Sequence, residues 1–362
     1  EANLAQHVFL LRQTFTAHSP HETFIVTAAR HGYRFVAPVH EMVADVRGTP
    51  AWSAYVRGRF LADQRTRESL IAGLRAYEEA LRIDERFVPA LSGLASCRVL
   101  QAEYLFEPPE VMELARAAAQ RAAAIDPSDV EAQLALGDVA WFYDWNAARA
   151  LEHYERAVWL DPASTRVRVF RTWFFGMTGE YDRAQNEIEI ALRREAFSLE
   201  LLTTHAALSI MRQAFLTAVQ QCEDILDMSP GYDAARYYRR VALAHGGSPA
   251  HSLKAFDSEE PTVEYRTQSL GVAGYAAALA GDQSRAQSIL AAIDGSAGLR
   301  SSYNVAYVLA GLGRLGDAAE ELERGIDRRD AWSVLIGTNP ALRSLPAIDQ
   351  INRRIRDGRR GD

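Results

Sequence analysis

A pattern of small and aromatic residues recurs along most of the chain, and it constrains the fold more than any other feature of the sequence. One clear copy ends at Pro162 and contains Ala150, Tyr154 and Ala157, at spacings of four and three. This spacing places the three side chains on one face of a helix. Small residues let two helices approach closely, and the aromatic ring fills the space beside them. The pattern therefore predicts pairs of packed helices.

Prolines at equivalent places give the repeat length. Pro162 and Pro230 are 68 residues apart, which corresponds to two units of 34. Pro127 and Pro162 are 35 residues apart, and this predicts a one-residue insertion around residues 143–146. A period of 34 residues is typical of the tetratricopeptide repeat, a helical hairpin that stacks into a superhelix with a concave groove. We expect a mainly α protein with about eight such hairpins between residues 51 and 330.

Composition and cysteine usage indicate a reducing, non-membrane environment. Apolar residues make up 48% of the chain and charged residues 24%, which is ordinary for a globular protein. No apolar run approaches the roughly 20 residues that a membrane-spanning helix needs. Cys97 and Cys222 lie far apart on helical patterns, so we expect two buried thiols without a disulfide. These features favour a cytoplasmic location.

Sequence motifs of common catalytic and cofactor sites are absent. The only lysine, Lys254, is not in a phosphate-binding Gly-Lys-Ser/Thr loop, and neither His-Glu-x-x-His nor Gly-x-Ser-x-Gly occurs. His18 and His21 lie in a loop with no cysteine or clustered acid beside them, so the sequence predicts no metal site. We therefore expect a binding protein that needs no cofactor and is not an enzyme.

The charge is distributed unevenly between the first residues and the rest. Residues 1–38 contain three Arg and two acidic residues, a net charge of +1, whereas the whole chain has a net charge of −7, which leaves −8 for residues 39–362. An acidic scaffold disfavours nucleic acid along its length. Any contact with DNA is therefore expected within the first 38 residues.

Those first residues have a different pattern from the repeats. Residues 1–15 predict an amphipathic helix, and residues 24–27 and 33–36 predict two short strands around a turn. A helix, a loop and a β-hairpin with a basic tip follow one another in the closing half of a winged-helix DNA-binding domain. The apolar stripe expected on the helix consists of Leu4, Val8, Leu11 and Phe15.

Two short motifs carry a resemblance to a known family. Leu11-Arg12 on the helix and Gly32-Tyr33-Arg34 at the end of the wing resemble the OmpR/PhoB-type winged helix. The extension at residues 35–39 is most similar to the CadC/HilA-like regulators, in which such a domain is joined to an effector region. Residues 51–79 and 137–154 resemble the repeat region of the cytoplasmic members of that subgroup. Residues 330–355, with Trp332, Asn339-Pro340, Leu345-Pro346 and Ile351, resemble their C-terminal closure.

The resemblance implies a domain organisation. Residues 1–38 are expected to be the C-terminal half of the winged helix, because the strands and helices of its first half do not precede them. Residues 39–50 are a linker and residues 51–330 the repeat solenoid. Residues 331–362 are a C-terminal capping segment and polar tail.

The resemblance also implies which side chains contact DNA. Polar residues at the start of the helix are expected to reach base edges in the major groove, and the tip of the wing is expected to reach the minor groove or its phosphates. Arg12 is expected to pack or to reach a phosphate, and Arg34 to contact DNA or to pack beside Tyr33. The predicted DNA-binding residues are Asn3, Gln6, His7, Arg12, Arg30, His31 and Arg34.

A second set of candidate residues lies on the first helices of the hairpins, whose free faces line the groove of such a superhelix. These side chains could hold a protein, a peptide or a small ligand. Core packing is the alternative for the tryptophan, and a solvated surface is the alternative for the charged residues. The candidates are Trp141, Arg168, Arg171, His205 and Arg212.

The resulting hypothesis is a bacterial DNA-binding transcriptional regulator. Its winged helix binds double-stranded promoter DNA, and its repeats bind a partner or effector or self-associate, with a dimer expected on two half-sites. Two alternatives stay open at this point. One is an interaction scaffold that does not bind DNA, and the other is the repeat module of a larger signalling enzyme.

Overall fold

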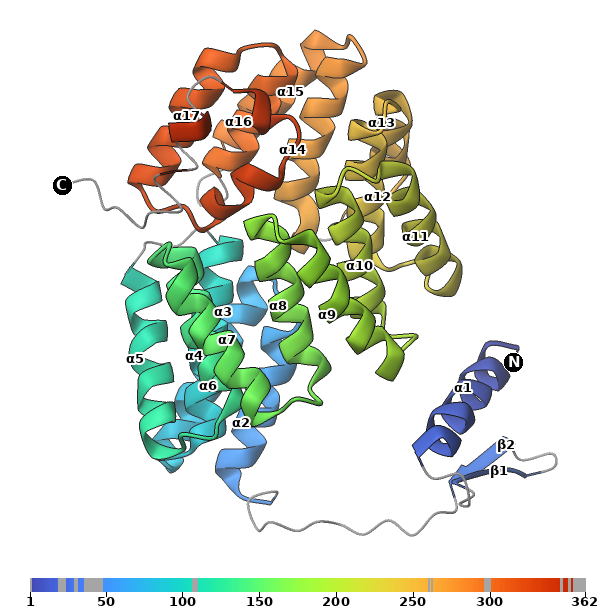
Figure 1. The fold of residues 1–362 in the computed structure, drawn as a ribbon, viewed down its shortest axis with the longest axis vertical. Coiled ribbons are helices and arrows are strands. Elements are labelled where there is room, and N and C mark those ends of the chain that lie inside the picture. The colour runs from blue at the N-terminus through green and yellow to red at the C-terminus, as the bar shows by residue number, and fades with distance from the viewer. Residues whose placement is uncertain are drawn as a thin grey trace. The chain divides into compact units, whose positions relative to one another are not determined.

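The computed structural model describes residues 2–18, 24–28, 32–35, 48–105, 110–259, 261, 263–295, 301–345, 348–350 and 353. The chain divides into two compact units, Glu1–Thr49 and Pro50–Asp362. Both units are drawn in Figure 1.

The first unit consists of one helix and a two-stranded sheet. Helix α1 (Ala2–His18) is followed by the antiparallel strands β1 (Ile25–Ala28) and β2 (Gly32–Phe35). The ring of Phe15 stacks on the ring of Phe24 at 4.8 Å, and Val8 is buried. Leu11, in contrast, is 47% exposed, which differs from the predicted stripe. Two short strands cover only part of one helix face, because a sheet this small has little apolar area.

The second unit is helical, and its α-helices pack as successive antiparallel pairs in the part of the chain that the structure describes. Neighbouring pairs stack on one another, as Figure 1 shows from α2 to α17. The pairs are α2 (Pro50–Ala62) with α3 (Arg67–Ile83), α4 (Val88–Leu105) with α5 (Glu110–Ile125), α6 (Val130–Asp138) with α7 (Ala147–Leu160), α8 (Thr165–Thr178) with α9 (Tyr181–Arg194), α10 (Leu199–Met211) with α11 (Phe215–Met228), α12 (Asp233–His245) with α13 (Pro249–Ser258), α14 (Val263–Leu279) with α15 (Gln283–Asp294), and α16 (Ser302–Gly311) with α17 (Leu315–Asp327).

Side-chain caps explain where several first helices begin. The hydroxyl oxygens of Ser164 and Ser198 accept from the backbone N–H groups of Val167 and Leu201, at the starts of α8 and α10. Each cap satisfies one of the backbone donors that a helix leaves unpaired at its N-terminus. The equivalent residue before α6 is an aspartate with the same role.

The small and aromatic residues of the repeat pack as the sequence predicts. Ala150, Tyr154 and Ala157 on α7 are all buried, and a Cβ atom added to Gly137 would lie 2.5 Å from the Tyr154 ring. This distance leaves no room for a side chain. The absence of a side chain at residue 137 therefore lets α6 and α7 approach closely.

The predicted insertion near residue 143 takes the form of a π-helical turn. This turn, η1 (Val139–Tyr143), follows α6 directly. The backbone N–H of Asp144 donates to the carbonyl of Val139, and that of Asn146 donates to the carbonyl of Ala140. Trp145 then adopts a positive φ of 54°. The extra residue is thus accommodated within the helix and changes where the following side chains point.

Residues 330–345, which we call the C-terminal segment, connect the last hairpin to the middle of the unit. The segment contains the 3-10 helices η2 (Ala331–Thr338) and η3 (Leu342–Ser344). Helix η2 contacts α4, η1 and α8 as well as α16 and α17. In Figure 1 it is the red segment beside α16. One core cluster therefore includes residues from α6 to α10 and from α15 to the C-terminal segment.

No helix in the part of the chain that the structure describes is both long and apolar enough to cross a membrane.

Candidate partner-binding site

Four aromatic side chains on first helices of different hairpins form what we call the aromatic patch. Trp173 lies on α8, Tyr237 and Tyr238 on α12, and Tyr265 on α14, and all four are half-buried. Ring centroids are 6.3 Å apart for Trp173 and Tyr238, 5.0 Å for Tyr237 and Tyr238, and 5.5 Å for Tyr237 and Tyr265. Large, partly exposed rings held in a rigid framework are typical anchors for a binding partner.

A second aromatic group surrounds the imidazole of His245. The imidazole centroid lies 5.0 Å from the ring centroid of Tyr275 and 5.6 Å from that of Tyr307, and its Nε2 shares a hydrogen bond of 2.6 Å with the Tyr307 hydroxyl. Burial lowers the pKa of His245 to about 4. The imidazole is therefore neutral at pH 7. The contacts among His245, Tyr275 and Tyr307 connect α12 with α14 and α16.

The two arginines predicted on α8 are used within their own hairpin. Arg168 Nη1 donates to Oε2 of Glu187 at 2.6 Å, and Arg171 Nε donates to Oε1 of the same carboxylate at 2.9 Å. Glu187, on α9, is only 4% exposed. A buried carboxylate between two arginines is a structural ion cluster. Both guanidiniums are therefore engaged within their own hairpin, and a role for Arg168 and Arg171 in binding a partner stays a prediction.

His205 and Arg212, the two candidates on and beside α10, lie around one glutamine. The amide nitrogen of Gln185 is 3.3 Å from Nε2 of His205, and its oxygen accepts from Arg212 Nη1 at 3.4 Å. A second amide, from Gln221, lies 3.3 Å from Nδ1 of His205. Burial lowers the pKa of His205. These two predicted residues are thus brought together, although not with the aromatic patch.

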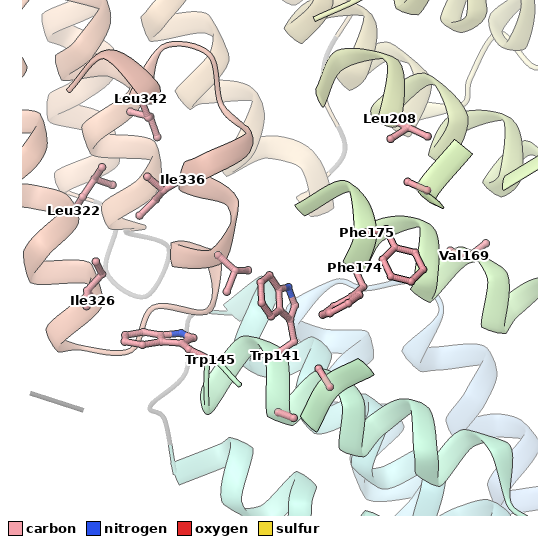
Figure 2. Packing of buried hydrophobic residues seen from close by; sticks show 14 of the residues in the cluster. Trp141, Trp145, Val169, Phe174, Phe175, Leu208, Leu322, Ile326, Ile336 and Leu342 are labelled. Carbon is pink, nitrogen blue, oxygen red and sulfur yellow. The ribbon is translucent and has the colours of Figure 1, made fainter. Parts of the chain in front are cut away.

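Trp141, the remaining groove candidate, is packed in the core beneath the C-terminal segment. It is 3% exposed, and its ring centroid lies 5.3 Å from that of Phe174. Figure 2 shows Trp141 and Trp145 on the side of the cluster that faces Ile336. Trp141 is therefore packed in the core in this structure, and a role for it in binding a partner stays a prediction.

The predicted DNA-binding residues are described to different extents. His7 is exposed on α1. Arg12 Nε donates to the carbonyl of Ile25 at 3.1 Å and Nη2 donates to Thr27 Oγ1 at 2.9 Å, so this guanidinium joins α1 to β1 in the packing role. The backbones of Asn3 and Gln6 are in α1 and that of Arg34 is in β2, whereas Arg30 and His31 lie outside the described residues.

Helix α12 contains a buried arginine that the repeat pattern does not predict. Arg240 is 1% exposed, and its Nη1 and Nη2 atoms have no hydrogen-bond partner. Burial lowers its pKa. The neighbouring Arg239 forms an ion pair with Glu259. The sequence feature that could have indicated this arginine is the run Arg-Tyr-Tyr-Arg-Arg at residues 236–240. This run interrupts the small residues that are expected where two helices cross.

Both cysteines are buried, as the sequence predicts. Cys97 and Cys222 are 1% and 0% exposed and unpaired, and burial raises the pKa of each thiol to about 12. The reactive thiolate form is therefore scarce at neutral pH. Among the residues placed by the structure, no three His, Cys, Asp or Glu side chains gather in a way that could hold a metal ion.

Comparison with known proteins identifies the fold. No protein-family model matches the chain, and no curated protein matches its sequence. Among solved structures, a tetratricopeptide repeat protein from Parabacteroides merdae is 13% identical, with a TM-score of 0.52 over 72% of this chain and 98% of that one. Human IFIT1 in a dimer with PPP-AAAA is 14% identical, with a TM-score of 0.57 over 77% and 73%. A monomeric IFIT1 mutant with Gppp-AAAA is 13% identical, with a TM-score of 0.61 over 86% and 72%.

These likenesses confirm the predicted helical-repeat fold of the tetratricopeptide type. They concern the repeats, and the winged-helix identity of the first unit stays a prediction. The class that these comparisons define is a helical-repeat fold of the tetratricopeptide type.

Proposed function

We propose that the chain binds a partner protein through the aromatic patch, as a scaffold without catalytic activity. The observation that carries the proposal is the patch itself, in which Trp173, Tyr237, Tyr238 and Tyr265 are half-buried on three first helices. Such rings contribute large apolar contact areas at a low cost in side-chain entropy, because each has only two rotatable bonds.

A protein partner fits this surface better than a nucleic acid does. The IFIT1 structures contain the RNA ligands PPP-AAAA and Gppp-AAAA in a similar fold. Here, however, residues 39–362 have a net charge of −8. Arg168 and Arg171 share the single carboxylate of Glu187, and Arg239 pairs with Glu259. The negative net charge and these ion pairs disfavour a polyanion as the partner.

Site-specific photocrosslinking tests the proposal. The photoreactive amino acid p-benzoylphenylalanine replaces Tyr265 in one chain and, as a control, the exposed Trp159 on α7 in another. We expect a discrete crosslinked protein from residue 265 only. The added substitution Trp173→Ala should reduce its yield by about tenfold, because removing an aromatic anchor weakens binding by roughly that factor. Equal crosslinking from both positions, or none from residue 265, would contradict the proposal.

A second candidate function is promoter binding by the first unit, in a cytoplasmic regulator that acts as a dimer. The observation that favours it is the arrangement of a helix followed by a β-hairpin, with Arg12 joining α1 to β1. In this proposal α1 acts as the recognition helix and the β-hairpin as its wing, and His7 is exposed on the helix.

A gel-shift assay tests this second function. The complete protein is titrated with its own upstream region, and the triple substitution of Asn3, Gln6 and Arg30 by alanine is compared with His153→Ala as a control in the second unit. We expect the triple substitution to weaken binding by about tenfold or more, because base and phosphate contacts are lost. Weak binding that is independent of DNA sequence and insensitive to these substitutions would exclude it.

A further inference from the structure

The surface beneath the C-terminal segment contains two hydrogen-bond donors without acceptors. The indole nitrogens of Trp141 and Trp145 are buried, and neither has a hydrogen-bond partner. Both residues belong to the core cluster that also holds Val334 and Ile336 of the C-terminal segment. Buried indole N–H groups normally find an acceptor. The C-terminal segment therefore fills this surface without satisfying its polar groups.

The backbone that carries the two indoles is irregular. Trp141 lies in the π-helical turn η1, and Trp145 has a φ of 54°. Single π-helical turns and left-handed non-glycine residues occur often at functional sites, because they are costly and persist where they position a side chain. Here the one-residue insertion, which interrupts the 34-residue period, places both indoles against the C-terminal segment.

Three polar side chains attach the C-terminal segment to the rest of the unit. At the beginning, the Asp330 carboxylate accepts from the backbone N–H groups of Ser302 and Trp332. Near the end, Arg343 Nη2 donates to the Tyr181 hydroxyl at 2.8 Å. Between these points Asn339 Nδ2 donates to the Tyr303 hydroxyl at 2.8 Å. The other contacts of the segment with the repeats come mainly from aliphatic side chains, of which Ile336 is 1% exposed. A short stretch of this kind can open without unfolding the hairpins.

We propose that this surface is a second binding site, which takes an apolar peptide segment of a partner protein, and that the C-terminal segment is its intramolecular occupant. The peptide would place aliphatic side chains where Val334 and Ile336 lie. It would also supply carbonyl oxygens that accept from the indoles of Trp141 and Trp145. This site is separate from the aromatic patch, so either proposal can fail alone.

Tethering explains why the site is closed in the free chain. A segment linked to its site by a short connection acts at a very high effective concentration. The connection here is the turn at Arg328–Asp330, directly after α17. A partner peptide competes by making the two indole hydrogen bonds that the C-terminal segment does not make.

Loosening the C-terminal segment in the full-length chain tests the proposal. The substitution Ile336→Ser weakens the segment and leaves the repeat surface intact. Ile293→Ser on α15 is the matched control, because Ile293 is equally buried in the same cluster but outside the segment. The probe is a fluorescein-labelled peptide with the sequence of residues 330–345. We expect Ile336→Ser to bind this peptide at least about tenfold more tightly than the wild type and the control do.

The indole N–H signals in a ¹H–¹⁵N NMR spectrum report whether the peptide binds at this site. The chain has six tryptophans, and the substitutions Trp141→Phe and Trp145→Phe assign the two relevant signals. We expect both signals to move when the peptide is added to Ile336→Ser. Binding that moves other signals and leaves these two unchanged would overturn the proposal, as would a folded Ile336→Ser chain that binds no better than the wild type.

Hydrogen exchange of the wild-type chain gives a test that does not depend on a variant. If the segment opens by itself, the amides of Ala331–Thr338 exchange at least about tenfold faster than the slowest amides of α8 and α10. If they exchange at the same rate as those slowest amides, the segment leaves only on global unfolding, and the proposal is wrong. This measurement decides the matter if Ile336→Ser does not fold.

Discussion

At the residue scale, the close approach of paired helices depends on single glycines. A Cβ atom at residue 137 would lie 2.5 Å from the Tyr154 ring, whereas one at Gly316 on α17 would meet no atom within 4 Å. We expect Gly137→Ala to lower the free energy of unfolding by about 1–3 kcal/mol, because overpacking forces the two helices apart. Gly316→Ala, the control, should be neutral or stabilising by up to about 1 kcal/mol, because alanine favours a helix. Urea unfolding measures both, and equal effects would contradict the packing argument.

A buried carboxyl group on α6 makes stability depend on pH. The Tyr154 hydroxyl donates to Oδ1 of Asp138 at 2.7 Å, and burial raises the pKa of this carboxyl to about 7 although the hydrogen bond opposes the shift. The unfolded value is about 4. Because the folded pKa is the higher one, the contribution of Asp138 to stability is complete below pH 4 and is lost as the pH rises to 7.

Asp138→Asn isolates this effect, because the amide does not titrate. Between pH 4.5 and 7.5 the wild type should lose about 2–4 kcal/mol of unfolding free energy relative to the variant. Urea unfolding at several pH values gives the two curves, and the titrating groups that do not interact with Asp138 cancel in their difference; Glu103, whose raised pKa depends partly on Asp138, contributes to it. Parallel curves would show that Asp138 is ionised in the folded chain.

At the element scale, much of the fold could be predicted and the direction of particular side chains could not. Small and aromatic residues at spacings of three and four predict helical hairpins, because the contacts that they make are within a hairpin or between neighbours. The position of Trp141 beneath the C-terminal segment could not be predicted, because the residues that cover it come almost 200 positions later in the chain. The aromatic patch was missed for a similar reason, since Trp173 and Tyr238 belong to hairpins that are not neighbours.

The hairpin formed by α12 and α13 contains a buried arginine, Arg240, whose Nε donates to the carbonyl of Arg236 at 3.1 Å. The terminal nitrogens of Arg240 have no hydrogen-bond partner, and burial lowers its pKa. We expect Arg240→Met to raise the unfolding free energy by about 1–3 kcal/mol, because an apolar side chain of similar length removes a buried unpaired charge. Arg239→Met is the control and should destabilise, because it leaves Glu259 unpaired. Thermal unfolding compares the two variants. A destabilised Arg240→Met chain would contradict the argument, because it would mean that the guanidinium makes stabilising interactions in the folded chain.

At the scale of the second unit, the C-terminal segment changes how the repeats depend on one another. In an open array each hairpin contacts only its neighbours, so the ends unfold independently. Here Arg343 donates to the hydroxyl of Tyr181, which is 162 residues earlier in the sequence. The last hairpin is thereby coupled to α8 and α9 directly. We therefore expect the repeats to unfold together in one transition, because the C-terminal segment connects hairpins that are far apart in the sequence.

Leu342→Ala tests this coupling. Leu342 is fully buried in η3, and its truncation should cost about 2–5 kcal/mol. Leu279→Ala at the exposed end of α14 is the control for the same change in size. Tryptophan fluorescence and far-UV circular dichroism should follow one urea transition in the wild type and the control. In Leu342→Ala the two probes should separate, because hairpins released from the closure unfold at different urea concentrations. Coincident transitions in all three chains would mean that nearest-neighbour contacts alone make the repeats cooperative.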